Sequence, residues 1–253
     1  MTETSSSDHP PRRWDWHIII AATFYPSLLT WIYFVLLKNN APSVQQTAYA
    51  IGKFAQFVFP ITWIWFFHRD FFKNNKILGQ IGKLSRADLI GIGFGVFVVA
   101  LMMTVYFGFL SSTEIAGGFV EKVKQKTIGV GIDSTWKFLC LGLFYASCHS
   151  FLEEYYWRWF VLGYLRKYFS STWAVVISSL GFMAHHVILL AVFFGADSPL
   201  AYLLAFGVGI GGVVWACLYL QSGSLKASWL SHLIVDAGIF SLGYFLIRPF
   251  LTV

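Results

Sequence analysis

Ionisable residues interrupt an apolar stretch of the chain, "FYASCHSFLEEYYWRWFVLGYL", which contains two adjacent glutamates and an arginine. A charged side chain at the centre of a membrane costs about 3 kcal/mol or more, so such residues usually mark a functional site. Glu154 and Arg158 are four residues apart, as are His149 and Glu153, which places each pair on one face of a helix. Glu153 should point about 100° away from Glu154. We therefore expect Arg158 to keep Glu154 ionised, while Glu153 exchanges a proton with water.

Two later apolar stretches carry polar residues at the same helical spacing. In "GFMAHHVILL", Phe182 precedes His186 by one turn, and in "WLSHLIVDAGIF", His232 precedes Asp236 by one turn. If the three helices pack together, their polar side chains share one pocket, which lowers the cost of burying each of them. The side chains that we expect to converge are Glu153, Glu154, His186, His232 and Asp236.

This set of residues fits the activation of water. A carboxylate can take a proton from water as the water attacks a carbonyl, while imidazole or amide donors stabilise the oxyanion, so the pocket predicts amide hydrolysis. The same side chains can also bind a divalent metal such as zinc, so a metal-dependent hydrolase stays open. A serine mechanism is disfavoured because Ser222 lies in the polar turn "LQSGSLK". We interpret His185 as structural, since it points off the face of Phe182 and His186, and His149 as a tether.

The composition indicates the medium in which these helices lie. The 253 residues are 57% hydrophobic and 12% charged, with a mean hydropathy of +0.64, which is typical of an integral, multi-pass membrane protein. The net charge of +6 arises from 18 basic and 12 acidic residues. In a membrane protein such an excess sets the topology, so we predict no nucleic-acid partner and the lipid bilayer as the surroundings.

The predicted fold class is all-α, a polytopic bundle of transmembrane helices. A span needs roughly 20 apolar residues, and about seven stretches qualify: 17–37, 48–67, 88–110, 136–160, 172–193, 199–220 and 228–248. An interfacial segment or hairpin near 111–135 would raise the count to eight. Residues 1–16 form a polar N-terminal tail, and residues 17–253 form a single transmembrane domain, because no linker or repeat divides them. The glycines of "FGVGIGG" predict close helix packing rather than a dinucleotide site.

The basic residues of the loops predict the orientation. In a seven-span arrangement, one side receives Arg12, Arg13, Arg69, Lys73, Lys76, Lys83, Arg86, Arg166, Lys167 and Lys226. We expect this side, and the N-terminus with it, to be cytoplasmic. The opposite side receives Lys38, Lys122, Lys124, Lys126, Lys137 and Arg248. In a bacterial host, the membrane would be the plasma (inner) membrane.

Three motifs together resemble those of a known family. "EEYYWR" is similar to its E-E-x-x-x-R motif, "FMAHH" to F-x-x-x-H, and "HLIVD" to H-x-x-x-N/D, and they occur in the family's order. The family is that of the CPBP intramembrane proteases, which includes the type II CAAX prenyl endopeptidases and the bacterial Abi proteins. The resemblance covers about residues 136–248, which would form the catalytic region.

The resemblance implies a role for each matching residue. Glu153 would activate the hydrolytic water, assisted by His186, while Glu154 organises the pocket and pairs with Arg158. His232 and Asp236 would support the oxyanion. In the type II CAAX proteases the third motif ends in Asn, whereas an ionised Asp236 accepts hydrogen bonds and donates none, which favours orientation of His232 instead. The family has been described both as glutamate-type and as metal-dependent. A metal would be held by Glu153, His186 and His232.

The predicted function is therefore that of an intramembrane endopeptidase. Its substrate would be a membrane-associated peptide or protein, including prenylated CAAX segments. The alternative is a non-proteolytic membrane protein, either a carrier that relays protons or an immunity or scaffold protein. A carrier usually shows repeated halves or broken helices, whereas the polar residues of this chain gather in its second half.

Overall fold

The computed structural model describes residues 13–69, 71, 77 and 83–252, and these form helices without any strand. The predicted all-α bundle is thus confirmed for this part of the chain. Most of the polar tail lies outside the described residues, as do Arg12, Lys73, Lys76 and the side chain of Arg13. The helices outside the centre are α1 (Arg13–Trp31), α2 (Pro42–Phe67), α4 (Arg86–Val105), α5 (Glu114–Gly129), α9 (Ser171–Phe194), α10 (Pro199–Ser222) and α11 (Lys226–Ile247).

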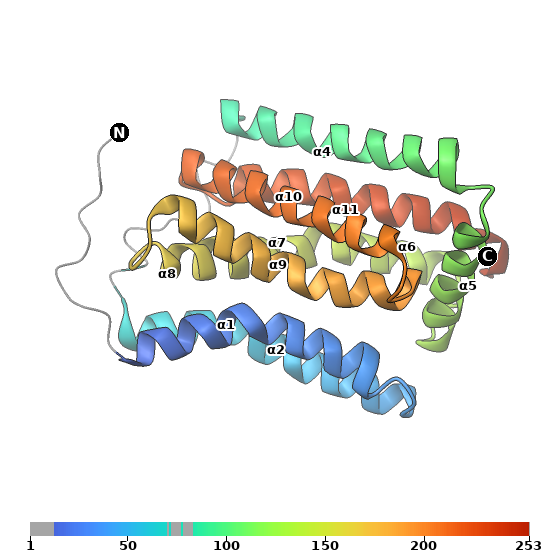
Figure 1. Cartoon of the computed structure of the whole chain (residues 1–253), viewed down its shortest axis with the longest axis horizontal. Coiled ribbons are helices and arrows are strands. Elements are labelled where there is room, and N and C mark those ends of the chain that lie inside the picture. The colour runs from blue at the N-terminus through green and yellow to red at the C-terminus, as the bar shows by residue number, and fades with distance from the viewer. Residues whose placement is uncertain (1–12, 70, 72–76, 78–82, 253) are drawn as a thin grey trace.

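Six helices in the described ranges are long and apolar enough to cross a membrane: residues 14–36, 42–67, 86–110, 171–194, 199–222 and 226–250. They correspond to six of the seven predicted spans. The remaining predicted span, 136–160, lies in a run of consecutive helical segments that we call the composite helix, residues 135–165. The shorter α5, in the stretch where an eighth span was considered, lies across the end of the bundle rather than along it (Figure 1).

The long helices run alternately in opposite directions, so the described members of the two predicted groups of loop cations lie at opposite ends of the bundle (Figure 1). The end of α2 and the start of α4 lie at the same end of the bundle as the start of α1, and so do the turns between the composite helix and α9 and between α10 and α11. The opposite end holds the α1 to α2 turn, α5 and the C-terminus. The assignment of the first end to the cytoplasm stays a prediction.

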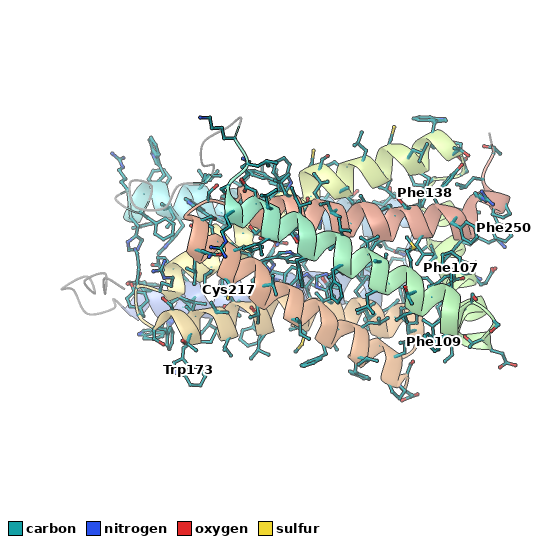
Figure 2. The ribbon with its side chains drawn as sticks, turned by 90° about the horizontal axis from the view of Figure 1, so that it is seen from above. Phe107, Phe109, Phe138, Trp173, Cys217 and Phe250 are labelled. Atoms are coloured by element: carbon teal, nitrogen blue, oxygen red, sulfur yellow. The ribbon has the colours of Figure 1, made fainter. Side chains whose placement is uncertain are left out.

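The composite helix is the centre of the bundle. Its C-terminal part, from Tyr155 to Leu165, is buried on every side, including Trp157 and Trp159. A helix that is apolar all round has to be enclosed by other helices, and this one contacts α2, α9 and α10. The outer helices instead direct apolar side chains outward, such as Phe109 and Trp173 (Figure 2). The bundle therefore has a fully buried central helix and an apolar surface that suits lipid.

The composite helix is not a regular α-helix. It consists of α6 (Thr135–Phe144), the π-helical η3 (Tyr145–His149), the short α7 (Ser150–Glu154), the π-helical η4 (Tyr155–Leu162) and α8 (Gly163–Leu165). Turns of π-helix are rare and frequently occur at functional sites. Here two of them enclose the single turn that carries Glu153 and Glu154.

Close packing through glycine holds α11 against α4, which lies diagonally over α10 and α11 in Figure 2. A Cβ atom on Gly95 would stand 2.8 Å from the carbonyl oxygen of Ser231, and one on Gly238 would stand 2.5 Å from Val99. Contact between helix backbones at this range requires glycine. Of the glycines in "FGVGIGG", Gly209 and Gly212 pack against α9, which confirms the interpretation of these two as packing residues.

Candidate active site

The structure brings the polar side chains of three helices to one place in the centre of the bundle. Glu153 and Glu154 come from α7, His185 and His186 from α9, and His232 from α11. The two glutamates and His232 are buried, with exposed fractions of 4%, 0% and 4%. The predicted convergence is therefore observed, and every i, i+4 pair inferred from the sequence makes a contact in the structure.

Glu154 is held by short contacts. Its Oε1 lies 3.1 Å from Nη1 of Arg158 and accepts a hydrogen bond of 2.9 Å from Nδ1 of His232. Arg158 in turn donates from Nη2 to the carbonyl oxygen of Gly212 at 3.3 Å, and its guanidinium lies 4.6 Å from the centre of the Phe182 ring. A buried charge is tolerated when it is paired in this way. Glu154 thus joins the composite helix to α10 and α11.

Glu153 has three imidazole neighbours at longer distances. Its Oε1 lies 3.6 Å from Nε2 of His185 and 3.9 Å from Nε2 of His149, and its Oε2 lies 3.7 Å from Nε2 of His232. These separations exceed a direct hydrogen bond and are those at which a bridging water should be considered. The carboxylate of Glu153 is therefore surrounded by polar groups without being tied to any of them.

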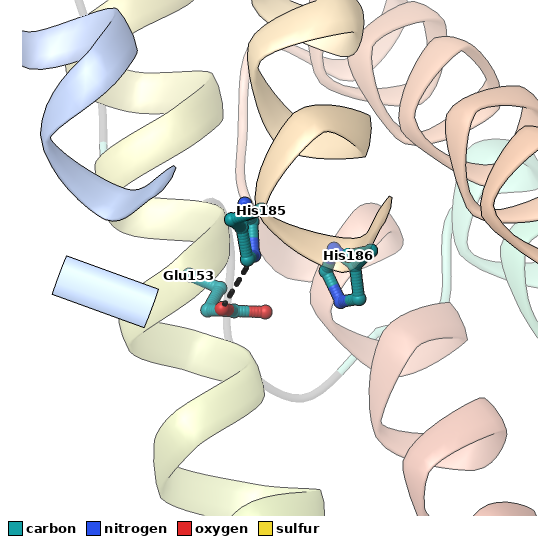
Figure 3. Close-up of side chains that lie close together, drawn as sticks. All are labelled: Glu153, His185 and His186. Carbon is teal, nitrogen blue, oxygen red and sulfur yellow. Dashed lines mark ion pairs between the residues drawn. The ribbon is translucent and has the colours of Figure 1, made fainter. Parts of the chain in front are cut away.

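His186 is oriented by the backbone of its own helix. Its Nδ1 lies 2.9 Å from the carbonyl oxygen of Phe182, which can only accept, so Nδ1 carries the proton. In the neutral ring, Nε2 then offers a lone pair. Figure 3 shows the His186 ring beside the carboxylate of Glu153.

His185 belongs to the same group, although its position on the helix had suggested a structural role. It is 6% exposed, its ring is parallel to that of Trp157 at 5.8 Å, and its Nε2 makes the ion pair with Glu153 drawn in Figure 3. Neither ring nitrogen has a hydrogen-bond partner within the described ranges. The helical-wheel argument failed because α9 presents two adjacent positions to the composite helix. The "HH" pair was the available signal.

His232 connects the two glutamates. Its ring is parallel to that of Trp215 at 4.1 Å, which fixes its plane, and its Nε2 lies 3.7 Å from Oδ1 of Asp236. Glu154 lies at one nitrogen, whereas Glu153 and Asp236 lie at the other. Asp236 is the less buried partner, with a side-chain exposure of 16%.

The described residues contain one group of three side chains that could hold a metal ion: Glu153, His185 and His186, whose ligand atoms lie within 4.8 Å of one another. The metal ligands predicted from the sequence were Glu153, His186 and His232, so the structure replaces His232 by His185 in this set. One carboxylate and two imidazoles suit zinc, although zinc bonds of about 2.0 to 2.2 Å would require these side chains to move closer together. The donor set therefore fits a divalent ion.

Comparison with known protein families gives an independent result. Residues 135–238 match the family described as type II CAAX prenyl endopeptidase Rce1-like. No curated protein and no solved structure matches the chain. The matched residues start at the first residue of α6 and end within α11, so they contain all of the acidic and imidazole side chains that form the group described above.

Proposed function

We propose that this chain, whose residues 135–238 match the type II CAAX prenyl endopeptidase Rce1-like family, hydrolyses a peptide bond of a membrane-associated substrate with water activated by Glu153. The family supports a protease of the membrane. The observation that carries the proposed mechanism is the contrast between the two glutamates. Glu154 is fixed at 2.9 and 3.1 Å, whereas Glu153 has its neighbours at 3.6 to 3.9 Å, which leaves its oxygens available to a water.

In this mechanism Glu153 is the general base. A water between Glu153 and His186 donates one hydrogen bond to the carboxylate of Glu153 and a second to the lone pair of His186 Nε2. As its oxygen bonds to the substrate carbonyl carbon, the proton moves to Glu153. When the carbon to nitrogen bond breaks, the protonated Glu153 returns this proton to the leaving amine. One water is consumed, and the products are a carboxylic acid and an amine.

His232 is suited to stabilise the oxyanion. With protons on both ring nitrogens it donates Nδ1–H to Glu154 and directs Nε2–H toward the reacting carbonyl oxygen, and the carboxylates around it favour that charge. Asp236 acts as a positioning residue for His232, because its distance of 3.7 Å keeps it beside the same nitrogen. Arg158 acts on the site only through Glu154.

A divalent ion is the alternative support for the same reaction. Glu153, His185 and His186 would hold it, and when bound it would polarise the carbonyl and lower the pKa of water. His185 therefore distinguishes the two versions. If a metal is required, His185→Ala should abolish metal binding and activity together, whereas a glutamate-type enzyme should retain part of its activity.

The proposed substrates are peptides or protein segments at the membrane, including prenylated CAAX segments, which carry the motif at their C-terminus. The end of the bundle with the turns between α2 and α4 and between α10 and α11 is proposed to face the cytoplasm, with the N-terminus on the same side. In a bacterium this membrane would be the inner membrane.

The test is cleavage of a prenylated peptide and of a library of membrane-tethered peptides by the purified chain, with Glu153→Gln as the inactive variant. We expect cleavage by the unmodified chain and its loss in Glu153→Gln. Activity that survives a chelator would favour the glutamate-type version, and activity that is lost and then restored by zinc would favour the metal-dependent one. Equal cleavage by both proteins, or by neither, would contradict the proposed protease.

A further inference from the structure

A lysine inside the bundle has no role in the mechanism above. Lys53 lies near the middle of α2, half-buried, with its Nζ 5.6 Å from the centre of the Tyr49 ring and 5.4 Å from that of Phe57. Within the described ranges its ammonium group has no hydrogen-bond acceptor and no carboxylate within ion-pair distance. A cation at this depth is costly, so an unpaired one indicates a function that supplies its partner.

Lys53 and Glu153 line the same part of the bundle. Phe57, one turn after Lys53, has its ring 6.4 Å from the ring of His149, and His149 lies one turn before Glu153. The charge of Lys53 is close enough to act on Glu153. The Phe57 ring lies between those of His149 and Tyr156, at 6.4 Å from each, so Phe57 is about level with Glu153. Because α2 and the composite helix run in the same direction (Figure 1), Lys53 lies about one turn, or roughly 6 Å, beyond Glu153 toward the end that holds the start of α2.

We infer that Lys53 binds the C-terminal carboxylate of the peptide substrate. This inference rests on the proposed function, and it adds a direction: the C-terminus of the substrate passes Glu153 and points toward the start of α2.

The surroundings of Lys53 favour a carboxylate as the partner. The aromatic rings of Tyr49 and Phe57 hold the ammonium by cation–π contact and offer it no anion. Because the residue lies in the middle of a helix that spans the membrane, lipid headgroups at either surface are too far away. Glu153 balances the lysine only at a distance, so a substrate carboxylate would be its first direct partner.

The experiment compares two peptides that differ only in the C-terminal group, one with a free carboxylate and one with a neutral amide. The proteins are the unmodified chain, Lys53→Met, Lys53→Arg and Lys126→Met. Lys126 is the matched control, because its Nζ also lies over an aromatic ring, 4.1 Å from Tyr33, but is hydrogen-bonded to Gln45 at 3.2 Å. Size-exclusion profiles in detergent establish that each variant is folded.

We expect the unmodified chain to cleave the acid about tenfold or more better than the amide, mainly through KM, because a charge-assisted contact is lost in the amide. The preference should fall to about threefold or less in Lys53→Met and persist in Lys53→Arg and Lys126→Met. Equal cleavage of acid and amide by the unmodified chain would overturn the inference. So would a preference that survives in Lys53→Met, or a loss of activity in Lys53→Met that is the same for both peptides.

Binding separates this inference from the proposed function. The affinity of both peptides is measured on the Glu153→Gln variant, with and without Lys53→Met, by the change in tryptophan fluorescence. Tighter binding of the acid that disappears with Lys53 supports the carboxylate site even if no peptide is cleaved. Equal binding of the two peptides overturns the site even if the chain proves to be a protease.

Discussion

Two buried polar clusters lie along the composite helix and its C-terminal extension, and they are built differently. Near its end, Asp15 accepts hydrogen bonds from the hydroxyls of Tyr164 at 2.5 Å and Tyr168 at 2.6 Å, and His68 lies 3.5 Å from the same carboxylate. In the candidate active site, the nearest imidazole nitrogens stand 3.6 to 3.9 Å from Glu153. The first carboxylate is fixed by direct hydrogen bonds, and the second has its imidazole neighbours beyond hydrogen-bond distance.

This difference teaches which buried charges are structural. A carboxylate whose hydrogen bonds are complete within the protein stabilises the packing of the helices around it. A buried carboxylate whose neighbours stand beyond hydrogen-bond distance contributes less to stability, and such a residue inside a membrane usually marks a functional site. The comparison therefore favours a folding role for Asp15 and supports the chemical role proposed for Glu153, while Glu154, with its short contacts, has a structural place within the candidate active site.

The largest effect is expected from Glu153→Gln, which keeps the shape of the side chain and removes the base. Peptide cleavage should fall about 10³-fold, since a general base contributes 10²- to 10⁴-fold, whereas the midpoint of thermal unfolding should change little. Cleavage assays and unfolding followed by tryptophan fluorescence measure both quantities. Glu121→Gln is the control, because Glu121 is an exposed residue paired with Lys124. A large loss of stability in Glu153→Gln would break the comparison.

The next effect is on stability. Arg158→Met leaves Glu154 buried without its cation, and breaking a buried pair in this way costs about 3 to 5 kcal/mol. Thermal unfolding in detergent should show the loss. The double variant Glu154→Gln with Arg158→Met should recover part of that stability, because both charges are then removed. If the double variant is no more stable than Arg158→Met, the pair is not the source of the effect.

Asp15→Asn should have a smaller effect that is opposite in kind to that of Glu153→Gln, on stability rather than on cleavage. Replacing the acceptor of the two tyrosine hydroxyls should destabilise the fold by about 1 to 3 kcal/mol, with kcat/KM for peptide cleavage unchanged at temperatures where the variant is folded. Asp133→Asn is the matched control, because its partner Lys137 lies in an exposed pair, and its unfolding should not change measurably. Loss of cleavage in folded Asp15→Asn would show that the two clusters are coupled.

The smallest effect is expected where α4 supports α11. Gly95→Ala places a Cβ atom against the carbonyl oxygen of Ser231, the residue before His232, and such overpacking costs about 1 to 3 kcal/mol. The displacement of His232 should lower kcat a few-fold. Gly93→Ala is the control on the same helix, because a Cβ atom there meets no atom within 4 Å. Equal effects of the two changes would indicate loss of helix flexibility rather than a shift of α11.

The sequence alone determined the membrane character, six long helical spans and the pairing of side chains four residues apart. These properties follow from local composition and from the helical period, which any segment carries by itself. The contacts of Glu154 with Arg158 and of His186 with the Phe182 carbonyl were predictable for this reason. The convergence of Glu153, His186 and His232 could be predicted from the sequence only on the assumption that their three helices pack together.

Only the tertiary structure decided how that packing is made. The two π-helical stretches around α7 change the helical register of the composite helix. Helix α9 meets the composite helix with two adjacent positions, so His185 faces Glu153, although the helical spacing in the sequence had predicted that it would point away. Lys53 is more than ninety residues from Glu153 in the sequence, and no local pattern connects them. Which charges lie within reach of one another depends on contacts between distant segments. In this chain, those contacts distinguish a carboxylate that holds the fold from one that is free to act on water.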